Sequence, residues 1–445
     1  MDWQNLTAAE QGRAIGAGDL DPVDITEGYL DAAAAHPHAD RIYARMTADR
    51  ARAEAVAAHD RAKAGMRLGP LDGVPISWKD LFDSAGVGTE AGSALLKGRV
   101  PGRDAEVLAA ATAGGLICLG KTHMSELAFS GLGLNPVTAT PPNVNDPALI
   151  SGGSSSGAAA SVAFGLASAG IGSDTGGSVR IPAAWNDLVG LKTTSGRVSL
   201  AGVVPLCLRF DTVGPLARSV EDAALLLAAL EGARAPDLTG SDLSGARLLV
   251  LDTVAFDAIE DAPAQAFDAA VARLETAGAQ ITRRAVPAVA EAMTLTGTLY
   301  APEAYGLWKD VIEAAPHKMY AEILERFRGG AAVSAPDYVA GWARLEALRG
   351  AYHEAVAGFD AVILPASPIL PPNIARLESD HAYYVERNLL ALRNTRIGNL
   401  MGSAALTLPT GVPSCGFMLM APPMGEARLL RLGAAVERVL RENPA

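Results

Sequence analysis

Residues 151–185 read SGGSSSGAAASVAFGLASAGIGSDTGGSVRIPAAW and contain two glycine-flanked serines 24 positions apart. Ser154 lies in Gly-Gly-Ser-Ser-Ser-Gly, and Ser178 lies in Thr-Gly-Gly-Ser-Val-Arg. The Ala-rich segment after Ser156 predicts a helix, and the apolar run at 167–171 predicts a strand. Such alternation of helices with short apolar runs predicts an α/β layered fold around a parallel or mixed sheet.

A lysine upstream of these serines, Lys79, stands between apolar residues at 74–76 and 81–82. A serine hydroxyl is a weak nucleophile until a base takes its proton. Lysine can be that base only when burial holds it neutral near pH 7, and apolar neighbours favour burial. Glycines beside Ser178 allow backbone N–H groups to converge on one oxyanion. The pattern therefore predicts a serine hydrolase without a catalytic histidine.

The order Lys79, Ser154, Ser178 resembles the amidase signature family, and the resemblance covers nearly the whole chain. Similar blocks lie at 69–80, 120–126, 189–192, 196–199, 211–215, 218–222 and 399–411. The resemblance implies one α/β/α layered domain around a mixed sheet. It also implies an amidase acting on linear amides through a serine acyl-enzyme, with no cofactor and no metal.

The resemblance assigns roles to individual residues. Ser178 would be the nucleophile and Lys79 the base, with Ser154 bridging them after a cis peptide bond at Gly153–Ser154. The implied oxyanion-hole residues are Thr175, Gly176, Gly177 and Ser178. The implied supporting residues are Ser155, Asp174 and Arg180.

The substrate is not encoded by any motif. We expect specificity to come from segments 124–135, 207–211 and 372–400. Candidate substrate contacts are Met124, Phe129, Cys207 and Asp187. Asp187 follows Asn186 where the family commonly has Cys-Gly, which would place a carboxylate near the site. Segment 372–395 is polar and aromatic, and predicts either part of a substrate lid or a solvated helix and loop.

Other residues compete for the catalytic roles. Residues 153–157 satisfy Gly-x-Ser-x-Gly with Ser155 central, the nucleophile elbow of α/β-hydrolases. An elbow needs a buried strand directly before it, whereas 143–147 predicts a loop, and no late histidine lies in a supporting motif. If Lys79 were only a structural cation, His123 would be the first alternative base. Lys121 and Lys192 are interpreted as structural.

The composition of the chain argues against some classes of function and location. The 445 residues carry a net charge of −12, which argues against a nucleic-acid partner. The three cysteines are far apart, which predicts buried thiols in a reducing, cytoplasmic compartment. The charge-free runs at 147–173 and 398–424 are broken by Gly, Ser or Pro, so no membrane span is predicted. We expect a homodimer that acts on a small-molecule amide.

The chain is expected to form a single domain, 1–445. It would comprise an N-terminal helical layer at 1–66, a core with the catalytic motifs at 67–235, and the rest of the core at 236–445. Expected helices start at Thr7 and Asp21 and occupy 48–64, 105–113, 220–230 and most of 286–358. Expected strands occupy 116–119, 246–251 and 361–365.

Two other functions share this sequence pattern. One is the glutaminase component of a tRNA-dependent amidotransferase, which works inside a complex. The other is a non-catalytic binding protein on the same fold. Co-purification with partner subunits would indicate the first, and failure to react with a serine-directed probe would indicate the second.

Overall fold

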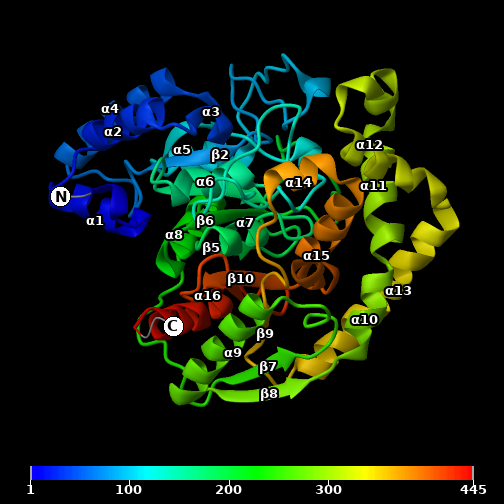
Figure 1. Cartoon of the computed structure of the whole chain (residues 1–445). Coiled ribbons are helices and arrows are strands. Elements are labelled where there is room, and N and C mark those ends of the chain that lie inside the picture. Colours follow the sequence, from blue (N-terminus) through cyan, green and yellow to red (C-terminus); the bar gives the residue numbers. More distant parts are fainter. Residues whose placement is uncertain (1–2, 443–445) are drawn as a thin grey trace.

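The computed structural model describes residues 3–442, and this part of the chain contains an 11-stranded mixed sheet (Figure 1). The strand order is β1-β3-β2-β4-β6-β5-β10-β11-β9-β7-β8. β2 pairs in parallel with β3 and β4, and β7 with β8 and β9, while the other pairings are antiparallel. The strands are β1 Tyr43–Met46, β2 Pro75–Lys79, β3 Ile117–Thr122, β4 Ala169–Ser173, β5 Val189–Lys192, β6 Val213–Ala217, β7 Arg247–Leu251, β8 Gln280–Arg284, β9 Ala361–Pro365, β10 Ala404–Pro409 and β11 Gly416–Ala421. The predicted α/β fold with a mixed sheet is confirmed.

The N-terminal helices begin at the capping residues that the sequence predicts. The Thr7 hydroxyl accepts from the Glu10 N–H, and the Glu10 carboxylate accepts from the Thr7 N–H. The Asp21 carboxylate accepts from the Val23 N–H, with Pro22 in the first turn, where its missing N–H is not needed. These helices are α1 Ala8–Ala17, α2 Pro22–Ala35, α3 Ala39–Ile42 and α4 Ala48–Lys63. They lie together in Figure 1, at the blue end of the colour scale.

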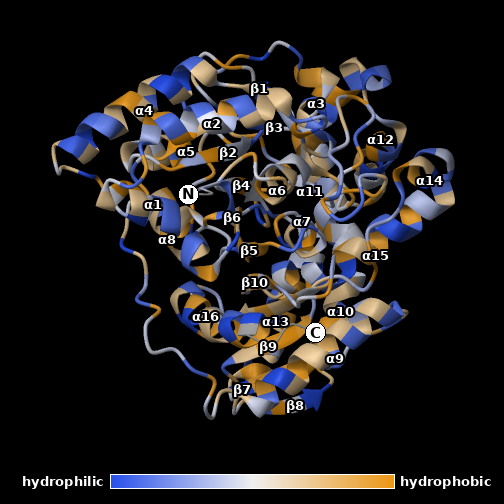
Figure 2. Cartoon of the chain, turned by 60° about the vertical axis from the view of Figure 1, so that its left-hand side comes forward, coloured by the Kyte–Doolittle hydropathy of each residue, from blue (hydrophilic) through white to orange (hydrophobic). Residues whose placement is uncertain are grey.

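Besides α2 and α4, the helices that pack on the sheet are α6 Ser156–Ala163, α7 Arg180–Trp185, α8 Val220–Glu231, α9 Asp261–Thr276 and α16 Glu426–Glu442. Helix α5 Glu106–Ala113 packs on α8. Short 3-10 turns occupy Trp3–Asn5, Ala94–Leu96, Glu126–Ala128, Pro316–Lys318 and Gly329–Ala332. In Figure 2 apolar residues concentrate on core strands such as β7 and β9, while the peripheral helices mix polar and apolar residues. No helix of residues 3–442 combines the length and the apolar character needed to cross a bilayer.

The region 286–358 is helical, as predicted, and forms a column along one side of the molecule in Figure 1. Its helices are α10 Pro287–Thr294, α11 Thr296–Ala314, α12 Ala321–Arg328 and α13 Ala335–Val356. The polar segment 372–395 is also helical, as α14 Ile374–Ser379 and the first part of α15 His381–Leu400. Because α15 contacts both α10 and α7, it lies between this column and the core.

Strand β4 explains how the catalytic motifs are assembled. It starts two residues later than predicted, after a turn in which the Leu166 N–H donates to the Ser161 carbonyl. A Cβ on Gly170 would lie 2.8 Å from the Ala158 carbonyl oxygen, and one on Gly172 would lie 2.6 Å from Ser155 Oγ. The small residues of β4 therefore let α6 and the loop before it pack directly on the strand. The strands from β1 to β11 share one sheet, which favours the single-domain prediction.

Candidate active site

Lys79 is the last residue of β2, and its ammonium group is fully buried. Its Nζ donates to Ser154 Oγ at 2.7 Å and to Ser173 Oγ at 2.8 Å. Ser173 is the last residue of β4, which pairs in parallel with β2. Because the carboxyl ends of parallel strands meet at one edge of a sheet, the fold itself brings Lys79 and Ser173 together. Sequence reasoning missed Ser173, and its position just before Asp174 at a strand end was the available signal.

Burial lowers the pKa of Lys79 from its ordinary value of 10.5 to about 7. The negative charges of Asp174 and Asp211 oppose this effect, but neither carboxylate hydrogen-bonds to Lys79. Desolvation disfavours the charged form of a lysine. A substantial fraction of Lys79 is therefore neutral near pH 7 and able to accept a proton.

Ser154 is held in a loop whose peptide bond Gly153–Ser154 is cis. The Gly153 N–H donates to the Gly131 carbonyl at 2.8 Å, and the Ser154 carbonyl accepts from the Ser125 N–H at 3.2 Å. A Cβ on Gly153 would lie 2.6 Å from the Gly133 nitrogen, so only glycine fits against the neighbouring loop. This close backbone packing fixes the position of Ser154 next to Lys79.

The loop before Ser178 contains three backbone N–H groups with no protein acceptor in the described chain, those of Thr175, Gly176 and Ser178. All three residues line the same cavity as the Ser178 side chain, so their N–H groups are available to an oxyanion. Gly177 is different, because its N–H donates to Asp174 Oδ1 at 2.9 Å. The buried carboxylate of Asp174 thus takes the Gly177 donor in this structure, and the composition of the oxyanion hole stays a prediction.

Asp174 and Arg180 form a buried ion pair, with the Arg180 Nη2 at 2.9 Å from Asp174 Oδ1. Burial alone would raise the pKa of Asp174, but the charge and hydrogen bonds of Arg180 hold it well below its usual range. Arg180 also donates to the Thr395 carbonyl at 2.6 Å, and Asn399 Nδ2 donates to Asp174 at 2.9 Å. The pair therefore connects the nucleophile loop to α15.

Ser155 does not occupy an elbow. Its Oγ donates to the Ser173 carbonyl at 3.1 Å and accepts from the Ser173 N–H at 3.2 Å, and the residue is fully buried. The residues directly before it form a loop rather than a strand. His123 contacts Ile42 and Gly157 through its backbone, and burial lowers its pKa to about 4. Among the described residues, neither its ring nor Ser155 Oγ hydrogen-bonds to Lys79 or Ser178.

Two further buried lysines are anchored to carbonyl groups. Lys121 Nζ donates to the Phe82 carbonyl at 2.5 Å and lies 3.4 Å from the Asp80 carboxylate. Lys192 Nζ donates to the Thr193 and Ser403 carbonyls at 2.9 and 2.8 Å. Neither lysine hydrogen-bonds to a serine of the described chain, which fits their interpretation as structural residues.

A cavity of about 180 Å³ opens at Ser178. Its lining residues are Ala128, Phe129, Ser130, Thr175, Gly176, Ser178, Leu206, Thr296, Gly297, Tyr300, Ala301, Arg326, Leu389, Leu392 and Arg396. Leu389, Leu392 and Arg396 belong to α15, so one face of this helix borders the cavity. Of the four candidate substrate contacts, only Phe129 is part of the lining.

The other three candidates lie outside the cavity lining, in well-packed surroundings. Met124 is fully buried, and its carbonyl accepts from the Asn135 side chain. The Cys207 N–H donates to Asp211, and its side chain is buried. The Asp187 carboxylate accepts from the Ser414 N–H at 2.8 Å and from Asn145 at 2.8 Å. The carboxylate that departs from the family pattern thus stabilises a loop.

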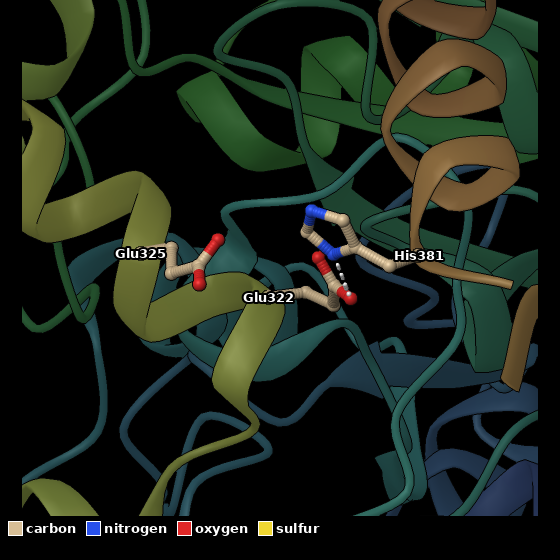
Figure 3. A group of neighbouring side chains, drawn as sticks. All are labelled: Glu322, Glu325 and His381. Atoms are coloured by element: carbon tan, nitrogen blue, oxygen red, sulfur yellow. Dashed lines mark hydrogen bonds and ion pairs between the residues drawn. The ribbon is translucent and has the colours of Figure 1, made fainter. Parts of the chain in front are cut away.

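One surface group has the residue types of a metal site. Glu322, Glu325 and His381 place their ligand atoms within 4.8 Å of one another, between α12 and α15 (Figure 3). His381 Nδ1 lies 2.7 Å from Glu322 Oε1, and this hydrogen bond raises the pKa of His381. The ion pair explains why two of the three residues lie together, and none of the three lines the cavity at Ser178.

Comparison with known proteins agrees with this geometry. The family model described as Amidase matches residues 24–430. The chain belongs to the amidase family. A 2-amino-5-chloromuconic acid deaminase from Comamonas testosteroni is 35% identical over 463 residues, covering 100% of this chain and 98% of that protein.

This amidase-family chain is also 33% identical to the A-type subunit of a glutamyl-tRNA(Gln) amidotransferase from Acidothermus cellulolyticus, over 99% of this chain and 96% of that protein. The solved structure of a peptide amidase from Stenotrophomonas maltophilia has a TM-score of 0.81 and 26% identity, covering 99% of this chain and 98% of the other. The chain is an amidohydrolase of this family.

Proposed function

We propose that this amidohydrolase cleaves the amide bond of a small molecule through an acyl-enzyme on Ser178. The observation that carries the proposal is the 2.7 Å hydrogen bond between Lys79 and Ser154, with the lysine buried and its pKa lowered to about 7. Ser154 is hydrogen-bonded to a base of lowered pKa, and the next residue, Ser155, donates its N–H to the Ser178 carbonyl at 3.1 Å. A base, a bridging serine and a second serine among free N–H donors are groups that acyl transfer needs.

In the proposed acylation, neutral Lys79 takes the Ser154 hydroxyl proton while Ser154 takes the proton of Ser178. The Ser178 oxygen attacks the amide carbon, and the resulting oxyanion accepts from the N–H groups of Thr175, Gly176 and Ser178. Collapse breaks the C–N bond, and Ser154 protonates the leaving nitrogen with the proton returned by Lys79. Ammonia or an amine leaves, and an ester on Ser178 remains.

Deacylation uses the same groups. Water attacks the ester carbon and passes its proton through Ser154 to Lys79. The new oxyanion binds the same N–H groups, and its collapse releases a carboxylic acid and returns the proton to Ser178 Oγ. Ser173, the second hydrogen-bond partner of Lys79, keeps the amine directed at Ser154 throughout this sequence. No cofactor or metal takes part in these steps.

The cavity of about 180 Å³ favours a small linear amide. The relative from Comamonas testosteroni, a deaminase of a muconic acid derivative by its name, supports a small substrate with a scissile C–N bond. We also propose a cytoplasmic homodimer that functions without further subunits. The relatives that are amidotransferase subunits by name favour a second candidate, a glutaminase component of a complex.

The test uses the purified chain alone, a panel of small amides including glutamine, and detection of released ammonia. We expect turnover without partner subunits, and a fluorophosphonate adduct that mass spectrometry locates on Ser178. Ser178→Ala should lose both while remaining folded. Ammonia release from glutamine only after partner subunits are added would support the amidotransferase role. An adduct on Ser155, or no adduct with a folded protein, would contradict the proposed nucleophile.

A further inference from the structure

Two guanidinium groups line the Ser178 cavity, Arg326 from α12 and Arg396 from α15. Figure 3 shows that the two helices approach each other at their first residues, where His381 of α15 lies beside Glu322 of α12. Arg326 Cζ lies 4.6 Å from the centre of the Phe129 ring, and Arg396 Cζ lies 5.7 Å from the centre of the Tyr300 ring. Aromatic rings thus support both groups inside the cavity wall.

Neither arginine has a carboxylate partner in the described chain. Arg396 Nε is buried without a hydrogen-bond acceptor, and so is the hydroxyl of Tyr300, a residue that is only 8% exposed. Burial lowers the pKa of both arginines, and for Arg326 the positive charge of Arg396 adds to this effect. Leaving buried donors unsatisfied is costly, because their interaction with water is lost and nothing replaces it.

Two other cations of the core, unlike this pair, have carboxylate partners. Arg180 is paired with Asp174 at 2.9 Å, and Lys121 lies 3.4 Å from Asp80. The uncompensated donors occur where the cavity meets the nucleophile loop. Arg396 Nε lies 3.9 Å from the position that a Cβ on Gly176 would occupy. An anionic group of a ligand in this cavity would satisfy all of these donors.

We propose that Arg326, Arg396 and Tyr300 form a carboxylate-binding site, and that the substrate is a small amide carrying a carboxylate beside its scissile group. The inference rests on the proposed function and specifies its substrate class. A guanidinium fork matches the planar carboxylate with two parallel N–H bonds, and the Tyr300 hydroxyl supplies a third donor. The closeness of Arg396 to Gly176 places the carboxylate within a few bonds of the amide carbon.

Binding can be tested without turnover in the Ser178→Ala protein, by titration calorimetry with succinate, inorganic phosphate and butyramide. We expect succinate to bind more tightly than the other two probes. Arg326→Gln and Arg396→Gln, each made in the Ser178→Ala protein, should weaken succinate binding about 10–100-fold, the usual range for hydrogen bonds to charged groups. The matched control is Arg328→Gln, because Arg328 lies on the same helix but pairs with Glu313 outside the cavity. It should bind succinate like its parent.

Turnover provides the second readout, with succinamate compared against butyramide, which replaces the carboxylate by a methyl group. Hydrolysis creates a carboxylate from any amide, so this matched pair separates substrate recognition from product binding. We expect the ratio of kcat/KM for succinamate to that for butyramide to fall about 10–100-fold in Arg326→Gln and in Arg396→Gln. In Arg328→Gln the ratio should not change.

The two proposals fail in different ways. Hydrolysis of neutral amides with no preference for succinamate, and no binding of succinate, would overturn the carboxylate site and leave the proposed function standing. Arginine-dependent binding of succinate by a protein that hydrolyses no amide would uphold the site and overturn the function. Tighter binding of phosphate than of succinate, lost in both variants, would refute the carboxylate as the recognised group.

Discussion

Replacing Lys79 by methionine should change both activity and stability, and the pH dependence of both effects follows from the pKa of Lys79. Burial lowers the pKa of Lys79 from 10.5 to about 7. Each pH unit between these values is worth about 1.4 kcal/mol. The unfolding free energy is therefore about 5 kcal/mol lower below pH 7, where Lys79 is charged in the folded protein, than at high pH, where it is neutral.

The sign of the pH dependence follows from proton counting. Below pH 7 the lysine is protonated in both states, and the folded protein carries the full cost. Between pH 7 and 10.5 the unfolded chain binds more protons, so the unfolding free energy rises with pH. Lys79→Met removes the cost but also the hydrogen bonds to Ser154 and Ser173, each worth about 1 kcal/mol. At pH 6 we expect the variant to be about 3 kcal/mol more stable than the wild type, with most of this advantage lost by about pH 9.

The activity of the wild type should rise about tenfold per pH unit up to about pH 7 and then level off, as the base loses its proton. Lys79→Met should lose about 10²–10⁴-fold in kcat/KM together with this inflection. Lys79→Arg should be equally poor, because its guanidinium stays protonated. The assays are the pH profile of kcat/KM and urea unfolding at pH 6 and 9.

Lys192 is the matched control, since burial also lowers its pKa to about 7 while its amine contacts only carbonyl groups. Lys192→Met should keep the inflection in kcat/KM. Loss of the inflection in Lys192→Met and its persistence in Lys79→Met would show that Lys79 is not the base. Near-wild-type activity of Lys79→Arg would lead to the same conclusion.

Three further predictions concern the loop around the nucleophile and the chemistry. In Gly177→Ala the new Cβ would lie 2.0 Å from Thr395 Oγ1, at a residue with a φ of +139°. We expect this variant to lose about 1–3 kcal/mol of unfolding free energy, measured by thermal unfolding. Gly176→Ala should lose less, because its nearest neighbour would lie 3.6 Å from the new Cβ. Arg180→Met leaves the Asp174 charge buried without a partner and should lower the free energy of unfolding by about 3–5 kcal/mol, measured with urea. Recovery of this free energy in the double variant with Asp174→Asn would confirm that the unpaired charge is responsible. EDTA should not lower kcat, because the proposed steps use only side chains and backbone N–H groups, and restoration of lost activity by added zinc would refute this.

Residues whose role depends on local sequence were predictable. Thr7 and Asp21 begin helices because a side-chain oxygen can accept from the exposed N–H groups of the first turn. The Ala361–Pro365 strand follows from its continuous apolar run. Lys79 and Ser154, far apart in sequence, were connected only through a resemblance to a family, and the structure places their side chains 2.7 Å apart.

Residues whose role depends on tertiary placement were not predictable. Ser173 became a partner of Lys79 because β2 and β4 are parallel neighbours, which no local pattern encodes. The Gly177 N–H was expected in the oxyanion hole, but in the structure it donates to the buried carboxylate of Asp174. Arg326 lies in an amphipathic helix and Arg396 in a largely buried one, and no local motif marks either arginine as a binding residue. Only the tertiary arrangement places both side chains in the lining of one cavity.

The buried charges around the nucleophile loop are compensated in different ways, and the differences fit the roles of these groups. Asp174 and Arg180 satisfy each other, so their burial makes the nucleophile loop rigid and requires nothing from a ligand. Lys79 meets the cost of burial by losing its proton, and the neutral amine is the form that the proposed acylation requires. Arg396 cannot do the same, because a guanidinium stays charged in proteins. The free-energy cost of desolvating Arg396 therefore persists in the free protein. Under the carboxylate-site proposal, an anionic group of the substrate removes this cost on binding, so a charged substrate binds more tightly than a neutral one.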